Sequence, residues 1–275
     1  MNISYGVSSE VGPRWRMEDA HRVVKDSELG VFGAEVFDGH IDAAAAEVAS
    51  AFLADYFLKE YRREQEKPPS QRRSVSELIK DAYLAGDAHI TQNGIHSGTA
   101  AASFYIIGET FWAANAGDAR IVMGAGPEAR ALTVDHRPSL PSERERVEAL
   151  GGRVISFDIP RVEGDLALSR TLGDVHLKPF VTPTPRIAEG YLGKENDFVI
   201  VACDGIWDVL PQEDVLSVAR KAASPEKAAK SIIIAALEAG SFDNMTVIVL
   251  DLRDYVSGLS REKMEIVEDK DWEFS

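Results

Sequence analysis

Five acidic motifs lie at the ends of predicted strands, and their side chains are well suited to metal chemistry. They are Glu18-Asp19, Asp38-Gly39, Gly117-Asp118, Asp204-Gly205 and Asp243-Asn244. An Asp between a buried strand and a glycine turn can point into a cleft at the edge of a sheet, and the glycine lets the backbone carbonyl approach an ion. Several converging carboxylates repel one another unless cations lie between them. The pattern therefore favours a site for hard divalent cations.

Each motif also has an ordinary interpretation, because Asp-Gly is a common turn dipeptide and one such pair is more often a turn than a ligand. Five of them in one chain favour the metal site. Other catalytic designs fit less well, since the sequence has no G-x-x-x-x-G-K-[ST], H-E-x-x-H, G-x-S-x-G or G-x-G-x-x-G motif. Cys203 is unsuited to be a phosphate-loop nucleophile, because Val209 stands where an arginine is needed. We interpret Cys203 as a buried core thiol.

The composition is that of a folded acidic chain. Over 275 residues, 30 Lys and Arg oppose 45 Asp and Glu, the formal net charge is −15, and 45% of the residues are apolar. These values exclude a disordered or fibrous chain. They also argue against nucleic-acid binding, because a negative protein repels phosphate backbones.

The sequence indicates no membrane partner and no export. Its apolar stretches fall far short of the roughly 20 residues that a membrane helix needs, and residues 1–12 do not resemble a secretory signal. Cys203 is the single cysteine, so no internal disulfide can form, which suits a reducing compartment. We expect a cytoplasmic monomer.

Strand and helix signals come in blocks. Strands are predicted at 3–9 and 31–37, a helix at about 43–66, and a second helix after the capping box of Ser74 and Glu77. Short apolar runs between 100 and 134 predict an antiparallel meander. The Ser74 cap is preferred to the alternative of a kinase site after Arg72-Arg73.

The second half of the chain follows the same pattern. A capping box at Ser142 and Glu145 predicts a short helix that stops at Gly151-Gly152, and a strand is predicted at 153–157. The remaining elements are a buried strand at 198–203, helices at 212–223 and 226–239, the latter capped by Ser224, and a closing strand at 247–251. This order favours an α+β layered domain over a doubly wound parallel sheet. The acidic segment 262–275 is predicted to be a loose terminus, with a docking motif at Trp272 and Phe274 as the alternative.

Nine segments, in order, resemble the metal-dependent protein phosphatases of the protein phosphatase 2C (PP2C, PPM) family, which dephosphorylate phosphoserine and phosphothreonine. They are Arg14–His21, Phe37–His40, Ser97–Ala100, Ala114–Arg120, Thr133–Pro138, Glu143–Gly152, Leu166–Asp174, Ala202–Asp208 and Asp243–Thr246. The resemblance implies one catalytic domain, here 1–255, before an acidic tail at 256–275. The implied fold is a four-layer α-β-β-α sandwich with two central antiparallel sheets and the metal cleft at one end.

The resemblance also implies a set of metal ligands. Asp38 would bridge two Mg²⁺ or Mn²⁺ ions, with Glu18 and the Gly39 carbonyl on one ion and Asp204 and Asp243 on the other. Asp118, together with Asp204, matches a weaker third-metal position. Asp19 matches an acid that holds metal-bound water.

Two further residues carry family roles. Arg14 matches the arginine that binds the substrate phosphate, since a guanidinium can bind two phosphate oxygens at once. Its neighbour Arg16 competes for that role, and the spacing to Glu18 selects Arg14. His40 matches the general acid for the leaving oxygen. Three other polar residues are interpreted as structural, namely His21, His136 and Ser169.

The implied function is hydrolysis of phosphoserine and phosphothreonine in signalling proteins. A water that bridges two cations would attack phosphorus in line, without a covalent intermediate. A partner-binding scaffold without activity is the first alternative, against which the complete set of acids counts. A two-metal nuclease is the second, and the acidic composition disfavours it.

Three stretches depart from the family pattern or vary within it. Ile41-Asp42 stands where the family has two glycines, so the turn beside the metals could differ and Asp42 could add charge there. Glu163 replaces a usual asparagine. The segment 178–191 resembles the family's variable flap on the substrate side, and it gives no identity for the target.

Overall fold

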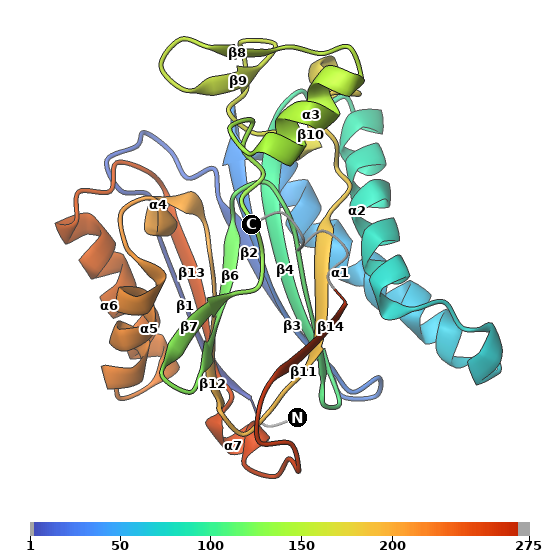
Figure 1. Ribbon diagram of the computed structural model, residues 1–275, viewed down its shortest axis with the longest axis vertical. Coiled ribbons are helices and arrows are strands. Elements are labelled where there is room, and N and C mark those ends of the chain that lie inside the picture. The colour runs from blue at the N-terminus through green and yellow to red at the C-terminus, as the bar shows by residue number, and fades with distance from the viewer. Residues whose placement is uncertain (1–2, 269–275) are drawn as a thin grey trace.

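Two antiparallel sheets packed face to face form the centre of the computed structural model, which describes residues 3–268 (Figure 1). The smaller sheet has the strand order β1 (Ser4–Glu10), β13 (Met245–Asp251), β12 (Asn196–Ala202), β6 (Arg120–Ala125) and β7 (Glu128–Ala131). The larger sheet has the order β14 (Glu265–Glu268), β11 (Arg186–Tyr191), β5 (Thr110–Ala116), β4 (Gly98–Ile107), β3 (Val31–His40) and β2 (Ala20–Asp26), and β10 (Leu172–Gly173) pairs with β4.

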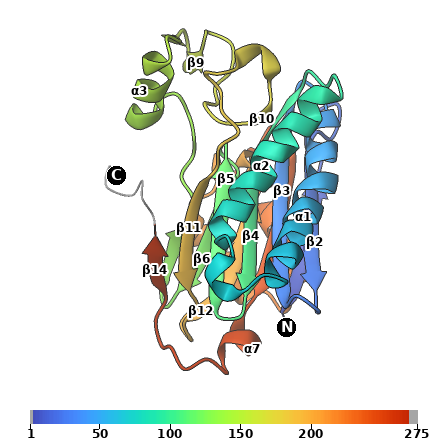
Figure 2. The same ribbon diagram turned by 90° about the vertical axis from the view of Figure 1, so that its right-hand side faces the viewer.

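Helices cover both outer faces of this pair of sheets. The larger sheet carries α1 (Ala44–Gln65) and α2 (Val75–Gln92), and the smaller sheet carries α5 (Gln212–Lys221) and α6 (Pro225–Glu238) (Figures 1 and 2). Short helices α4 (Asp204–Trp207) and α7 (Arg253–Val256) follow β12 and β13. The predicted four-layer α-β-β-α sandwich is confirmed.

Strand β3 shows how the sequence fixes these layers. Its residues Phe32, Ala34 and Val36 pack between the two sheets. Val31 and Phe37 face the other way and pack against α1 and α2. Because successive side chains of a strand point to opposite faces, a strand covered on both sides reads as an almost continuous apolar run.

Helix ends agree in part with the capping signals. The capping box of Ser74 and Glu77 is formed at the start of α2, and the Ser224 hydroxyl accepts a hydrogen bond from the Lys227 amide at the start of α6. The box predicted at Ser142 is wrong. Helix α3 (Pro141–Ala149) begins two residues earlier than a Ser142 cap implies, because proline suits the first helical position, and Leu140 precedes it without a side-chain cap.

The predicted meander at 100–134 is wrong in one respect. Strands β4 and β5 form a hairpin in the larger sheet, but β6 belongs to the smaller sheet, so the chain crosses between the sheets at Gly117–Ala119. Strand β13 is an interior strand rather than the closing one, and β2 was not predicted. The crossing matters most for function, because it carries Asp118.

The end of the described chain also differs from expectation. The segment 265–268, predicted to be loose, forms strand β14 against β11. Trp272 and Phe274 lie outside the described residues. Within 3–268, no helix combines the length and the apolar character that crossing a membrane requires.

A buried carboxyl group lies between the larger sheet and its helices. Glu35 of β3 is fully buried and accepts hydrogen bonds from the hydroxyls of Tyr105 and Ser103. Its second oxygen has no partner among the described residues. Burial raises the pKa of Glu35 to about 7, although the hydrogen bond from Tyr105 opposes this shift.

We expect Glu35→Gln to gain stability relative to the wild type as the pH rises. The carboxyl has an ordinary pKa of 4.5 when the chain unfolds and about 7 when it is folded, so the wild type loses stability between these values. The difference between the two free energies of unfolding should change by about 2 kcal/mol from pH 5 to pH 8. Urea unfolding across this range measures it. The exposed Glu238→Gln is the control, and a pH-independent difference for Glu35→Gln would show that Glu35 ionises normally.

Candidate active site

The predicted metal ligands converge at one end of the sandwich. Asp38 lies near the end of β3, Asp118 on the crossing between β5 and β6, and Asp204 at the start of α4, two residues after β12. The three carboxylates have oxygens within 4.8 Å of one another. Asp243 reaches the same end from the loop that precedes β13. Residues far apart in the sequence therefore meet because their strands begin or end at the same edge.

These residues line a cleft of about 500 Å³. All the predicted site residues except Asp19 contribute to its walls, namely Arg14, Glu18, Asp38, Gly39, His40, Asp118, Asp204 and Asp243. A small sheet of β8 (Val154–Ser156) and β9 (Pro160–Val162) stands over the cleft as a flap, and residues 159–161 and 166–168 complete the wall. The predicted flap at 178–191 is wrong, because 186–191 is strand β11 of the larger sheet.

The carboxylates strongly affect one another's ionisation. Burial, followed by the charges of Asp118 and Asp208, raises the pKa of Asp204 to about 8. Burial and the charge of Asp204 hold the pKa of Asp38 well above its usual range. The pKa of Asp118 rises to about 6, because burial outweighs the opposing charge of Arg137. Such a cluster favours divalent cations, which would stabilise all three ionised forms together.

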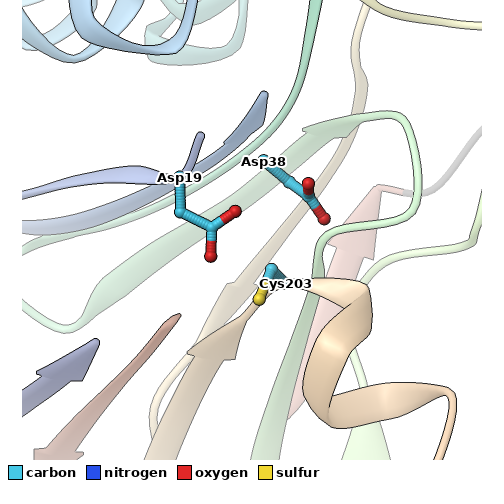
Figure 3. A group of neighbouring side chains, drawn as sticks. All are labelled: Asp19, Asp38 and Cys203. Carbon is cyan, nitrogen blue, oxygen red and sulfur yellow. The ribbon is translucent and has the colours of Figure 1, made fainter. Parts of the chain in front are cut away.

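Asp19 lies beside this cluster rather than in the wall of the cleft. Figure 3 shows the carboxylates of Asp19 and Asp38 and the sulfur of Cys203 around a common space, and their ligand atoms lie within 4.8 Å of one another. Both Asp19 oxygens are buried and lack a hydrogen-bond partner among the described residues. Burial raises the pKa of Asp19 to about 6. Buried carboxylate oxygens of this kind require an ordered water or ion, so the residues fit the predicted metal centre.

Cys203 is a structural thiol, as predicted. It is fully buried, its sulfur accepts a hydrogen bond from the Thr246 amide at 3.1 Å, and it donates to the Asn244 carbonyl at 3.4 Å. Burial and the charge of Asp19 raise the pKa of the thiol. A buried thiol that stays protonated is a poor nucleophile.

Gly39 allows the loop that carries Glu18 to touch strand β3. A Cβ atom at this position would lie 2.3 Å from the Glu18 carbonyl oxygen, so any side chain would push the loop of Glu18 away from β3. The missing side chain also keeps the Gly39 backbone open to the cleft.

The two competing arginines have different surroundings. Arg14 lines the cleft, where it donates from Nε to the Phe242 carbonyl at 3.1 Å and binds the Asp243 carboxylate at 2.5 Å. Arg16 donates to Glu18 at 2.7 Å and to the Ile41 carbonyl, and it is absent from the lining of the cleft. The geometry therefore favours Arg14 as the group that meets a ligand in the cleft.

Sequence reasoning assigned no role to several residues that shape the site. Asn244 joins two loops, because its side chain accepts from the Glu18 amide at 2.7 Å and donates to the Val11 and Arg16 carbonyls. Asp174 binds Nε2 of His40 with both carboxylate oxygens, at 3.0 and 2.9 Å. Both residues lie within the family-like segments, which was the available signal, but only the contacts show what they touch.

Arg137 was also missed. Its guanidinium joins two acids, binding Asp118 at 2.9 Å and Asp208 at 2.7 Å on the wall of the cleft. A cation bound at Asp118 would compete with this guanidinium.

The departures from the family pattern have local explanations. Ile41 adopts a left-handed backbone, with φ of 75°, in the turn where the family has glycine. Asp42 accepts a hydrogen bond from the Ala44 amide at 2.9 Å at the start of α1, and it does not line the cleft. Glu163, also left-handed, binds Arg153 within the flap. Asp42 thus adds no carboxylate to the wall of the cleft.

Comparison with known proteins gives a consistent result. A family model described as Protein phosphatase 2C matches residues 3–245. Probable protein phosphatase 2C 59 of Arabidopsis thaliana is 33% identical over 273 residues, covering 96% of this chain and 85% of the relative. Probable protein phosphatase 2C 52 of Oryza sativa subsp. japonica is 34% identical over 255 residues, covering 90% of this chain, and this chain spans only 50% of that relative.

A solved structure shares the fold. The structure of a C. elegans sex determining protein matches with a TM-score of 0.83 and 26% sequence identity, covering 95% of this chain and 68% of that one.

We expect Asp204→Asn to stabilise the metal-free protein at pH 8 by at least about 2 kcal/mol, because it removes a buried carboxyl whose ionisation costs stability. The folded pKa of about 8 exceeds the ordinary 3.8, so the wild type loses stability as the pH rises between these values. Urea unfolding in the presence of EDTA, which keeps the protein free of metal, measures this gain in the free energy of unfolding. With excess Mn²⁺, the midpoint should rise for the wild type and much less for the variant. The exposed Asp254→Asn is the control, and an unchanged metal response in Asp204→Asn would remove Asp204 from the ligand set.

Proposed function

The chain belongs to the protein phosphatase 2C family, a family of protein phosphatases, and we propose that it hydrolyses phosphoserine and phosphothreonine in proteins with Mg²⁺ or Mn²⁺. The observation that carries this proposal is the convergence of Asp38, Asp118 and Asp204 within 4.8 Å, in a cleft that also holds Arg14 and His40. Phosphorylated signalling proteins are the proposed partners.

The proposed ligands divide between two cations. Asp38 would contact both, with Glu18 and the Gly39 carbonyl on one and Asp204 and Asp243 on the other. Asp118 and Asp204 would hold a weaker third ion, and the contact of Arg137 with Asp118 gives a reason for that weakness. When bound, such cations make hydroxide available near neutral pH and stabilise the charge that develops on the phosphoryl group.

Arg14 is proposed to hold the phosphate group. Its Nε and one terminal nitrogen are engaged by Phe242 and Asp243, which fix the orientation of the guanidinium. The other terminal nitrogen has no partner among the described residues, and so it can donate to a phosphate oxygen. Because the cleft is rich in carboxylates, this positive charge also reduces the repulsion of a phosphate dianion.

His40 is proposed to protonate the leaving group. As the oxygen of the attacking water bonds to phosphorus, the bond from phosphorus to the serine or threonine oxygen breaks, and that oxygen takes a proton from His40. An alkoxide is a poor leaving group without this proton. The buried, hydrogen-bonded Cys203 supports a direct displacement rather than a covalent intermediate.

The alternatives receive less support. A scaffold without activity would not need a complete set of converging acids, whereas every predicted acid of the metal site is present and lies at one edge. A nuclease would need cationic surface to follow a polyanion, and the net charge of −15 opposes that.

The decisive assay uses a phosphothreonine peptide and p-nitrophenyl phosphate as substrates. We expect turnover of both with Mn²⁺ or Mg²⁺, none with EDTA, and a loss on the order of 10²-fold or more in Asp38→Asn, because a cation ligand is removed. Asp254→Asn should retain wild-type turnover, which controls for nonspecific effects of the substitution. Full activity in Asp38→Asn would refute the proposed mechanism, and a folded, metal-binding wild type without turnover would favour the scaffold.

A further inference from the structure

We propose that Asp174 is a positioning residue that holds His40 in the orientation and tautomer needed to protonate the leaving oxygen. This inference rests on the proposed function, because it assigns a partner to the proposed general acid. It concerns a residue outside the wall of the cleft, which acts on the substrate only through His40.

The contact between the two side chains is close and largely buried. Both oxygens of Asp174 lie within 3.0 Å of Nε2 of His40. The Asp174 side chain is 1% exposed, whereas that of His40 is 24% exposed and lines the cleft. The acid therefore approaches the imidazole from the protein interior, on the side away from a substrate.

The surrounding structure keeps Asp174 in place. The Thr171 hydroxyl donates a hydrogen bond to Oδ2 of Asp174 at 2.6 Å. The Asp174 backbone is left-handed, with φ of 47°, which is unfavourable for a residue other than glycine and needs support from its neighbours. Such unfavourable backbone geometry is concentrated at functional sites, where it holds a side chain in place.

Gly98 leaves room for the pair. A Cβ atom on this glycine, the first residue of β4, would lie 1.9 Å from Oδ2 of Asp174 and 2.6 Å from Nε2 of His40. Any larger residue at 98 would therefore separate the two side chains. Gly98 of β4 and the segment Thr171–Asp174 thus make this one contact possible.

The contact determines which nitrogen of His40 can serve as the acid. A carboxylate accepts a hydrogen bond, so Nε2 carries a proton and donates a hydrogen bond to Asp174. Nδ1 has no partner within residues 3–268 and is the nitrogen left for the substrate. When the phosphorus–oxygen bond breaks, its electron pair stays on the leaving oxygen, which takes the proton from Nδ1. Neutral His40 then keeps its Nε2 proton and its bond to Asp174.

The chain contains a second contact between a histidine and an aspartate, which is exposed and lies outside the wall of the cleft. Nε2 of His176 lies 3.1 Å from Asp165, but these side chains are 47% and 63% exposed, and neither residue lines the cleft. Replacing Asp165 removes the same kind of contact without touching His40. Asp165→Asn is therefore the control for Asp174→Asn.

The test compares two leaving groups in the Mn²⁺-loaded protein. Asp174→Asn keeps the shape of the side chain. However, its neutral amide cannot offset the positive charge of an imidazolium, and it can present an N–H group to Nε2. We expect kcat for a phosphothreonine peptide to fall by about 10- to 100-fold with KM changed less than about twofold. For p-nitrophenyl phosphate, kcat should change less than about threefold, because nitrophenolate leaves without a proton. Asp165→Asn should change neither value.

A second comparison separates positioning from a general structural effect. In a His40→Ala background, Asp174→Asn should cause no further loss on the peptide, since its effect passes through His40. Equal losses on both substrates, or the same loss with and without His40, would overturn the inference. Thr171→Val should show a smaller, equally selective loss, and it decides the question if Asp174→Asn does not fold.

These measurements distinguish a failure of this inference from a failure of the proposed function. A folded wild type that hydrolyses neither substrate with Mn²⁺ refutes both proposals. A wild type that hydrolyses both, with Asp174→Asn equally slow on each, refutes only the role of Asp174.

Discussion

The confinement of several carboxylates to one buried edge is the constraint on which the rest of this structure depends. Burial raises the pKa values of Asp38, Asp118 and Asp204, and the charge of Asp118 raises those of Asp38 and Asp204 further. Folding must hold these groups together against their repulsion. It does so by attaching them to strands and to the crossing between the sheets, whose positions are fixed by the apolar core.

The polar contacts around the cleft counteract this repulsion. Arg14 binds Asp243, Arg16 binds Glu18, and Arg137 joins Asp118 to Asp208. In a chain of net charge −15, these guanidinium groups lie where negative charge is concentrated. They leave the innermost acids, Asp38 and Asp204, without an arginine partner among the described residues. This arrangement reserves the centre of the cleft for stronger cations.

A second buried network supports the flap side of the cleft. Glu143 of α3 is 2% exposed, and it binds Arg170 at 2.5 Å, Arg146 at 2.9 Å and the Ser169 hydroxyl at 2.7 Å. Although burial opposes ionisation, the Arg170 guanidinium lowers the pKa of Glu143 to about 2. The network ties α3 to the segment that begins with the cleft residues 166–168 and ends at Asp174. The wall of the cleft and the partner of His40 are thus held by the same stretch of chain.

The sequence by itself determined the layered α+β fold and most of the elements, because strand alternation, helical spacing and the caps at Ser74 and Ser224 are local properties. Its acidic motifs also indicated the site, since the residue types needed to bind hard cations can be recognised in the sequence alone. Tertiary structure decided three other features: the crossing at Gly117–Ala119, the interior place of β13 and the position of the flap. Tertiary structure also decided the contacts of Asp174 with His40 and of Asn244 with the loop between β1 and β2. They join residues that are 134 or more positions apart, and no local pattern specifies which distant side chains meet when strands are brought into register.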